Sequence, residues 1–331
     1  MINPRIPTIA DVRAAMLVVG RHLKPTPLLY SRKLSSMLGS KIYIKLENLQ
    51  PIRSFKLRGG INYFHAMGDL AAKQGVVTAS TGNHAQSIAY AGRLFNTQVK
   101  VVMPQGVSCI KVEAVRELGA EVLFHGSFFE EALAKAQRLS QREGYLLVHP
   151  INEPLIIEGV ATMHLEVFEE LPDVDMVINP IGGGSGASGA CIVYKELKPS
   201  VTVVGVQAKG APAFYRSWKR GSITSTKGVK TIAEGLATST AYELPLRIMQ
   251  GRIDDIILVS DHDMINAVRL LLEAIGQVAE PSGAASTAAA LAIRKRLEGK
   301  VVVLMLTGGN IQSEILKKII TGEIEDGGKL G

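Results

Sequence analysis

Short apolar runs alternate with segments of helical spacing between residues 76 and 148. Buried strands are predicted where most residues in a run are apolar, at 76–79, 99–103, 121–124 and 145–148. Helices are predicted where apolar residues recur every three or four positions, at 83–95, 111–118 and 130–142. Short buried strands that alternate with helices are typical of a parallel sheet.

A second set of apolar runs flanks this region. Strands are predicted at 42–46, 176–179, 201–206, 256–259 and 301–306, with a helix at 186–197. We therefore predict an α/β fold with two open, twisted, mostly parallel sheets and helices on both faces. A small domain at 75–149 is inserted into a larger one formed by 1–74 and 150–331. A long loop is expected at 227–235 and a polar tail at 323–331.

Composition narrows the function classes. The chain has 331 residues, 47% of them hydrophobic, and a net charge of +7, which indicates a globular protein of about two domains. Lysine and arginine are scattered and aromatic residues make up only 5%, so a nucleic-acid partner is disfavoured. The apolar runs are far shorter than the ~18 residues of a membrane span, so no membrane partner is expected.

The cysteines and the N-terminus indicate a cytoplasmic protein. Cys109 and Cys191 are isolated, without the spacing of a zinc site or a disulfide framework, and we expect both to be small buried residues. The first 16 residues show no basic segment followed by an apolar run, so they do not resemble a secretory signal.

In an open parallel sheet, ligands bind at the carboxyl ends of the strands. The loop at 180–189 follows a predicted strand, opens a helix and is rich in glycine. Successive backbone N–H groups can turn there toward one anion, which favours a phosphate site over a plain flexible turn. No lysine follows the glycines, so the loop is not a P-loop.

Two further loops carry candidate chemistry. The segment at 80–86 places hydroxyls and an amide beside a helix N-terminus, where they could bind a carboxylate or simply cap the helix. Lys56 lies between Phe55 and Leu57, and an amine in an apolar pocket loses proton affinity and becomes nucleophilic.

A phosphate site and a nucleophilic lysine together imply a cofactor with both a phosphate and an aldehyde, and pyridoxal phosphate fits this description. Thr307, at the end of the strand 301–306, offers a hydroxyl to the pyridine nitrogen. A neutral partner leaves that nitrogen largely unprotonated, which favours elimination of a β-substituent over transamination.

These motifs, in this order, resemble the fold-type II pyridoxal-phosphate enzymes, whose fold is that of the tryptophan synthase beta subunit. The resemblance is to the branch of threonine and serine dehydratases and serine racemase, and it covers about residues 20 to 320. The segments that carry it are 26–28, 47–51, 54–59, 80–86, 182–186, 232–235, 280–284 and 307–310.

The resemblance implies a role for each motif. Lys56 would form the Schiff base with the cofactor, Phe55 would pack beside its ring, Asn83 would bind its phenolic oxygen and Thr307 would face its nitrogen. The residues implied to hold the phosphate are Gly182, Gly183, Gly184, Ser185 and Gly186. Those implied to meet the substrate carboxylate are Ser80, Thr81 and Gly82, with His84 orienting their loop.

The implied activity is dehydration and deamination of a β-hydroxy amino acid, L-threonine or L-serine, to a 2-keto acid and ammonia. The resemblance also implies a homo-oligomer, a dimer or a tetramer. The alternatives are a serine or aspartate racemase, or a threo-3-hydroxyaspartate ammonia-lyase, on the same scaffold. A non-catalytic protein that only binds the cofactor is a more distant hypothesis.

Departures from the family pattern bear on the substrate. Thr81 stands where the racemase has a catalytic serine, so a hydroxyl is retained at that position. Gln207 and Ala213 stand where the racemase has metal-binding carboxylates, so we expect no metal site. Arg53 replaces a usual glycine and could either lie on the surface or bind an acidic substrate side chain. Glu158 and Glu234 also depart from the usual residues.

Overall fold

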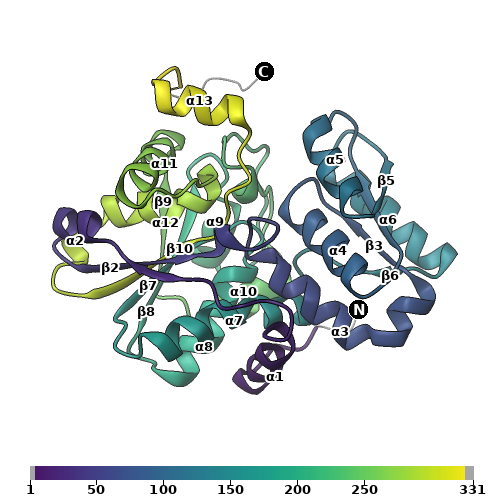
Figure 1. The fold of residues 1–331 in the computed structure, drawn as a ribbon, viewed down its shortest axis with the longest axis horizontal. Helices are drawn as coiled ribbons and strands as arrows, with labels where there is room; N and C mark the ends of the chain where they lie inside the picture. Colours follow the sequence, from purple (N-terminus) through teal and green to yellow (C-terminus); the bar gives the residue numbers. More distant parts are fainter. Residues whose placement is uncertain (1–3, 325–331) are drawn as a thin grey trace.

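The structure is a computed structural model that describes residues 4–324 (Figure 1). It contains a six-stranded sheet of order β1-β2-β10-β7-β8-β9 and a four-stranded sheet of order β5-β4-β3-β6. Neighbouring strands are parallel in both sheets, except that β1 pairs with β2 in the antiparallel sense. The predicted α/β fold with two mostly parallel sheets is confirmed.

The strands lie close to their predicted positions. They are β1 Leu28–Tyr30, β2 Lys41–Leu46, β3 Val76–Ala79, β4 Val99–Met103, β5 Glu121–Phe124, β6 Leu146–Leu147, β7 Met176–Pro180, β8 Thr202–Ala208, β9 Asp255–Val259 and β10 Val301–Leu306. The strand predicted at 145–148 is shorter, and β1 was not predicted because three residues at a sheet edge leave no readable pattern.

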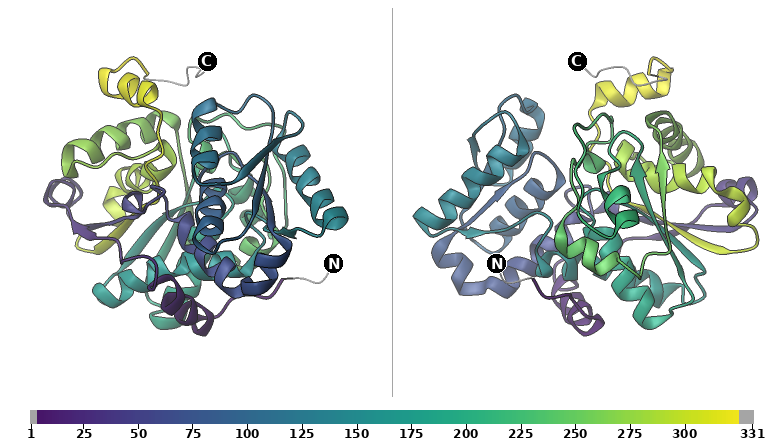
Figure 2. Two further views of the ribbon diagram at one scale, coloured as in Figure 1. Left: turned by 45° about the vertical axis from the view of Figure 1, so that its right-hand side comes forward. Right: turned by 180° about the vertical axis from the view of Figure 1, so that it is seen from behind.

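Helices cover both faces of the larger sheet (Figures 1 and 2). The helix α12 packs on β7 to β10, with α11 outside it, whereas α8 packs on the opposite face against β7 and β8. The helices are α1 Ile9–Val19, α2 Arg32–Leu38, α3 Lys56–Gln74, α4 Asn83–Leu94, α5 Cys109–Glu117, α6 Phe129–Glu143, α7 Pro154–Glu170, α8 Ser185–Leu197, α9 Ala213–Arg220, α10 Glu243–Met249, α11 Asp261–Ile275, α12 Pro281–Ala292 and α13 Ser313–Thr321.

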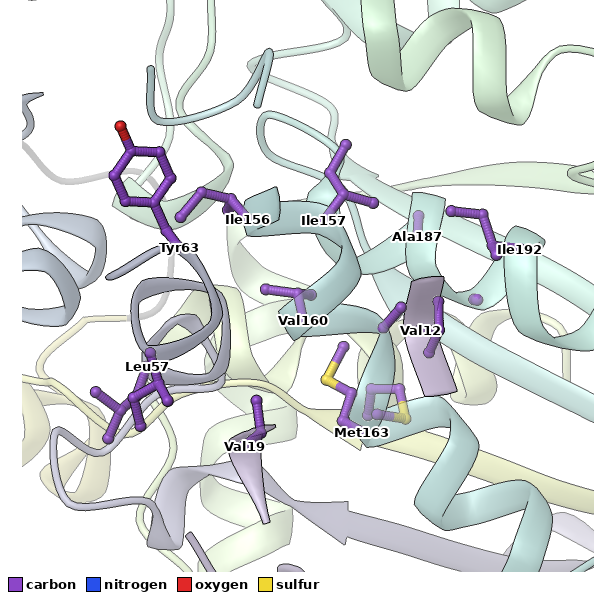
Figure 3. Close-up of a cluster of buried hydrophobic side chains, with 14 of the residues drawn as sticks. Val12, Val19, Leu57, Tyr63, Ile156, Ile157, Val160, Met163, Ala187 and Ile192 are labelled. Carbon is purple, nitrogen blue, oxygen red and sulfur yellow. The ribbon is translucent and has the colours of Figure 1, made fainter. Parts of the chain in front are cut away.

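The helix α7 is the centre of the main core. It packs between α3 and α8 and also contacts α1, and Figure 3 shows side chains of all four helices meeting there. Gly59 and Gly159 allow α3 and α7 to approach closely: a Cβ on Gly59 would lie 2.7 Å from the carbonyl oxygen of Ile156, and one on Gly159 would lie 2.4 Å from that of Arg58. This contact fixes the start of α3, where Lys56 lies.

Some predictions were wrong or fall outside the structure. Cys109 is exposed, because the helix α5 begins there, two residues before the predicted start; Cys191 is buried as expected. Most of the polar tail predicted at 323–331 lies outside the described residues. Within residues 4–324, no helix is long and apolar enough to cross a membrane.

The inserted domain at 75–149 remains a prediction. All four strands of the smaller sheet fall within those residues. The helices α4, α5 and α6 of the same segment pack against that sheet, which is consistent with a separate layer of structure.

Candidate active site

A cavity of about 450 Å³ lies where the loops after β3, β7 and β10 meet. These loops follow the carboxyl ends of parallel strands, where ligands of open α/β sheets bind. The cavity brings together every residue that the sequence singled out for the site: Phe55, Lys56, Ser80, Thr81, Gly82, Asn83, His84, Gly182, Gly183, Gly184, Ser185, Gly186 and Thr307.

Lys56 is the first residue of α3 and points at the glycine loop. Its Nζ donates a hydrogen bond to Oγ of Ser185 at 2.9 Å and lies 5.0 Å from the centre of the Phe55 ring. Burial lowers the pKa of the Lys56 amine to about 8. The amine is therefore partly neutral at physiological pH, which is the form that attacks an aldehyde.

The glycine loop presents unpaired backbone N–H groups. Within the described chain, the N–H groups of residues 182–187 donate to no acceptor, although most of these residues are buried. They lie at the start of the 13-residue helix α8, whose N-terminus carries partial positive charge. Such an array fits a phosphate dianion.

Glycine is required here by close packing and by backbone conformation. A Cβ on Gly182 would lie 2.0 Å from the carbonyl oxygen of Gly235. Gly184, the residue before α8, has φ 102°, in the left-handed region that favours glycine. The loop can therefore fold into this shape only with glycine at these two positions.

The start of α4 also presents unpaired backbone N–H groups at the same cavity. Gly82 precedes this 12-residue helix and provides no side chain to cap it. The N–H groups of residues 83–85 donate to no acceptor among residues 4–324. Ser80 lines the cavity, and its Oγ accepts from the N–H of Gly82 at 3.3 Å. Free N–H groups beside hydroxyls fit a substrate carboxylate.

His84 lies behind this loop and is held as a neutral ring. The Thr78 hydroxyl donates to the carbonyl oxygen of Val148 at 2.8 Å, so it can only accept from Nε2 of His84, 3.1 Å away. The proton is thereby assigned to Nε2, and Nδ1 is a buried acceptor with no partner in the described structure. Burial lowers the pKa of His84 well below its ordinary value, so the ring stays uncharged.

Thr307 and Asn83 line the remaining wall. Thr307 is 6% exposed, and its hydroxyl makes no hydrogen bond within the described residues, whereas its carbonyl oxygen accepts from the N–H of Phe55 at 3.2 Å. Asn83 donates from Nδ2 to Glu280 and accepts at Oδ1 from Asn310. A free hydroxyl and an anchored amide are available to polar groups of a ligand ring.

These groups fit pyridoxal phosphate. The N–H groups at 182–187 suit its phosphate, the Lys56 amine suits its aldehyde and the Thr307 hydroxyl suits its ring nitrogen. When bound, this cofactor supplies an electron sink for bond changes at the substrate Cα.

Several cavity residues had no predicted role, because their contacts join segments far apart in the chain. Glu280, which directly precedes α12, contacts Asn83 across 197 residues. Lys111 of α5 forms an ion pair with Glu234 at the cavity wall. The sequence signals were weak. Glu280 and Glu234 lie in segments that resemble the family, but no pattern of residues predicted their contacts with Asn83 and Lys111.

Arg53 also lines the cavity, and its backbone is strained. It has φ 54°, a conformation that non-glycine residues rarely adopt. Its N–H donates to the carbonyl oxygen of Gln50 at 2.6 Å and its carbonyl oxygen accepts from Gly309 at 2.9 Å, which fixes the turn. The guanidinium forms no ion pair with a described residue.

Comparison with known proteins agrees with this geometry. The model of the family described as pyridoxal-phosphate dependent enzyme matches residues 19–308. The chain is 36% identical over 324 residues to the L-threonine ammonia-lyase of Thermotoga maritima, covering 98% of this chain and 80% of that protein. It is 33% identical over 322 residues to the L-threo-3-hydroxyaspartate ammonia-lyase of Saccharomyces cerevisiae, covering 97% and 98%.

Comparison with solved structures also finds a relative of this fold. Maize serine racemase matches with a TM-score of 0.91 at 30% identity, covering 96% of this chain and 98% of that one. The family match spans both sheets, since it includes β1 to β10, and it covers the cavity loops after β3 and β7 and the first two residues of the loop after β10. The chain therefore belongs to the family of pyridoxal-phosphate dependent enzymes.

Proposed function

We propose that this enzyme dehydrates and deaminates L-threonine or L-serine to a 2-keto acid and ammonia. The observation that carries the proposal is that Lys56 shares one cavity with two sets of unpaired N–H groups, at 182–187 and at 83–85. One array fits a phosphate and the other a carboxylate, so an amino acid bound there would have its Cα near Lys56. The similarity to L-threonine ammonia-lyase supports the same reaction.

Lys56 is the proposed base. With its pKa lowered to about 8, Nζ can accept the Cα proton and still return it near neutral pH. The hydroxyl of Ser185, which accepts from Nζ at 2.9 Å, keeps the amine directed into the cavity. We assign Phe55, Asn83 and Thr307 to the cofactor ring.

Thr307 favours elimination. Its hydroxyl shares at most one neutral hydrogen bond with the pyridine nitrogen, whereas a carboxylate would hold that nitrogen protonated. An unprotonated ring would withdraw less negative charge from the substrate Cα. Loss of the β-hydroxyl group would then compete better with transamination. A β-hydroxy amino acid is the substrate class that this arrangement suits.

A racemase is the second candidate, and Thr81 is the observation that favours it. Its side chain lines the cavity and makes no hydrogen bond within the described residues, so its hydroxyl is available as a second acid or base. The similarity in fold to maize serine racemase supports this alternative. Threonine is β-branched and therefore stiffer at χ1 than serine.

The two candidates are separated by a substrate panel. L-serine, L-threonine, D-serine and threo-3-hydroxyaspartate are incubated with the wild type and with Thr81→Ala, and keto acid and enantiomer are measured separately. We expect keto-acid release from L-threonine or L-serine to exceed enantiomer interconversion, and to persist in Thr81→Ala. Interconversion that outpaces keto-acid release in the wild type and disappears in Thr81→Ala would identify a racemase. The matched control is Thr81→Ser, which keeps the hydroxyl.

We further propose a cytoplasmic homo-oligomer. Both cysteines are free, which suits a reducing compartment. Sedimentation equilibrium of the purified enzyme tests the oligomer: a mass near 35.5 kDa, that of one chain, would exclude it.

A further inference from the structure

A chain of three polar side chains runs along one wall of the cavity. Nδ2 of Asn310 donates to the carbonyl oxygen of Ile52 at 2.8 Å and to Oδ1 of Asn83 at 2.7 Å. Nδ2 of Asn83 in turn donates to Oε1 of Glu280 at 2.8 Å. The three side chains come from the loop after β10, the start of α4 and the residue before α12, so they connect three separate segments.

The carbonyl oxygen of Ile52 fixes the direction of the whole chain. A carbonyl can only accept, so Asn310 must present its amino group to it. The second hydrogen of that amino group goes to Asn83, so Asn83 must present its oxygen to Asn310 and its own amino group to Glu280. One N–H of Asn83 is used by Glu280, and the other remains for the cavity.

Glu280 is held tightly against the backbone at the end of β10. Its N–H donates to the carbonyl oxygen of Gly308 at 3.1 Å. A Cβ on Gly308 would lie 2.2 Å from Oε1 of Glu280, so glycine is needed there for the carboxyl group to reach Asn83.

The surroundings of Glu280 make it a titrating group near neutral pH. Burial raises the pKa of its carboxyl to about 7, although hydrogen bonds with Asn83 and Ser282 oppose this shift. The charged groups that act on it are Glu234, which raises the pKa, and Lys111, which lowers it; these two form an ion pair with each other.

We propose that Glu280 and Asn310 are positioning residues for Asn83, which they hold so that its free N–H binds the phenolic oxygen of the cofactor. This proposal rests on the proposed cofactor site. An ionised Glu280 is a stronger acceptor than a protonated one, so it orders and polarises the Asn83 amide more strongly. The hydrogen bond to the phenolic oxygen therefore depends on the charge of Glu280.

A double-mutant cycle on cofactor affinity tests this coupling. The dissociation constant of pyridoxal phosphate is measured for the wild type, Asn83→Ala, Glu280→Gln and the double variant. We expect Glu280→Gln to weaken binding about tenfold, and the double variant to bind within about twofold of Asn83→Ala alone, because Glu280 acts through Asn83. Independent, multiplying losses in the double variant would overturn the proposal.

Asn310→Asp provides a near-isosteric second variant. A carboxylate cannot donate to Oδ1 of Asn83, so the amide loses its fixed direction and we expect a similar tenfold loss of affinity. Unchanged affinity in this variant would contradict the role of Asn310.

The absorption spectrum of the bound cofactor gives a readout that a purely structural role would not move. In the wild type we expect the spectrum to change with pH as Glu280 titrates, and this change to disappear in Glu280→Gln. The matched control is Glu130→Gln: Glu130 lines the same cavity but bonds to Ser239 instead, so its variant should keep the transition. A transition that persists in Glu280→Gln would refute the assignment.

These outcomes are separate from those of the proposed reaction. An enzyme that binds the cofactor and shows the expected cycle, but turns over no hydroxy amino acid, would refute the proposed function and leave the positioning roles supported. An enzyme that turns over a hydroxy amino acid, but whose double variant shows independent, multiplying losses of cofactor affinity, would support the proposed function and refute the positioning roles.

Discussion

Arg58 binds Glu47 through two hydrogen bonds of 2.8 Å, from Nε to Oε2 and from Nη2 to Oε1, and both side chains are fully buried. Arg58 also donates to Glu166, and Lys45 pairs with the same carboxylate at 2.7 Å. Two cations thus balance two anions beneath the start of α3. This cluster anchors the helix two residues after Lys56.

We expect Glu47→Gln to lower the free energy of unfolding by about 3–5 kcal/mol, because the remaining cations would exceed the anions in a buried site. Urea denaturation measures the change. The matched control is Glu273→Gln, which removes an exposed ion pair with Lys33 and should cost less than about 1 kcal/mol. Equal effects of the two variants would contradict a buried, coupled cluster.

The Glu47 pair also has a defined pH dependence. Burial alone would raise the pKa of Glu47, but the charges of Arg58 and Lys45 and the hydrogen bond from Thr26 hold it below its ordinary value. The contribution of Glu47 is therefore complete above its unfolded pKa, about 4.3, and is lost as the pH falls through the lower folded value. In Glu47→Gln this part of the acid destabilisation should be absent.

The apoenzyme should capture pyridoxal phosphate with a pH midpoint near 8. Burial lowers the pKa of Lys56 to that value, and only the neutral amine attacks the aldehyde, so the rate should rise as the pH passes through about 8. Stopped-flow absorbance at about 410 nm follows the attachment. Lys56→Ala is the control and should show no covalent attachment. A midpoint near the ordinary lysine value of about 10.4 would show that the pocket does not tune the amine.

Glycine at 182 and 184 should be essential for cofactor affinity. Gly182→Ala places a Cβ 2.0 Å from the Gly235 carbonyl oxygen, and Gly184→Ala imposes φ 102° on a residue with a side chain. Either change displaces N–H donors, and hydrogen bonds to a charged group contribute about 1.5–3 kcal/mol each. We therefore expect affinity for pyridoxal phosphate to fall about 10- to 100-fold.

The control for the glycine variants is Gly228→Ala. No atom lies within 4 Å of a Cβ at Gly228, and its φ is not in the left-handed region, so cofactor affinity should be unchanged. Titration calorimetry of the apoproteins measures all three variants. Full affinity in both Gly182→Ala and Gly184→Ala would remove the glycine loop from the proposed cofactor site.

The sequence predicted the elements whose pattern is local. The strands β3, β4 and β5 are short runs in which most residues are apolar, they lie between helices, and their bounds match the predictions. The glycine loop before α8 was predicted to bind a phosphate, and the segment before α4 was a candidate either for binding a carboxylate or for capping the helix, because glycine and hydroxyl residues directly follow a strand at both places. Both signals lie within ten residues of the feature that they predict.

Features that depend on distant segments were not predictable in the same way. Glu47 and Arg58 lie in segments that resemble the family, but their pairing and the contact with Glu166 depend on how α3 packs against α7. Glu280 and Asn83 both bond to the loop after β10, Glu280 through the carbonyl oxygen of Gly308 and Asn83 through Asn310, and they meet beside it. Such pairings follow from tertiary packing, which residue type alone does not encode.

Arg53 should determine how well an acidic substrate competes with threonine. Arg53 lines the cavity, and its guanidinium has no ion-pair partner among the described residues; a second substrate carboxylate would supply one. We expect Arg53→Gly to lower kcat/KM for threo-3-hydroxyaspartate at least about tenfold relative to that for L-threonine, the loss expected for one charged contact. Arg53→Lys keeps the charge and should retain part of the preference.

Arg53→Gly should also stabilise the fold, because glycine adopts φ 54° without strain. We expect the free energy of unfolding, measured by urea denaturation, to rise by about 1 kcal/mol. Asn96→Gly separates the two effects. Asn96 also has positive φ, at 50°, but does not line the cavity, so this variant should leave substrate preference unchanged. If Arg53→Gly gains stability and keeps the wild-type preference, the arginine does not contact the substrate and the strained turn has another cause.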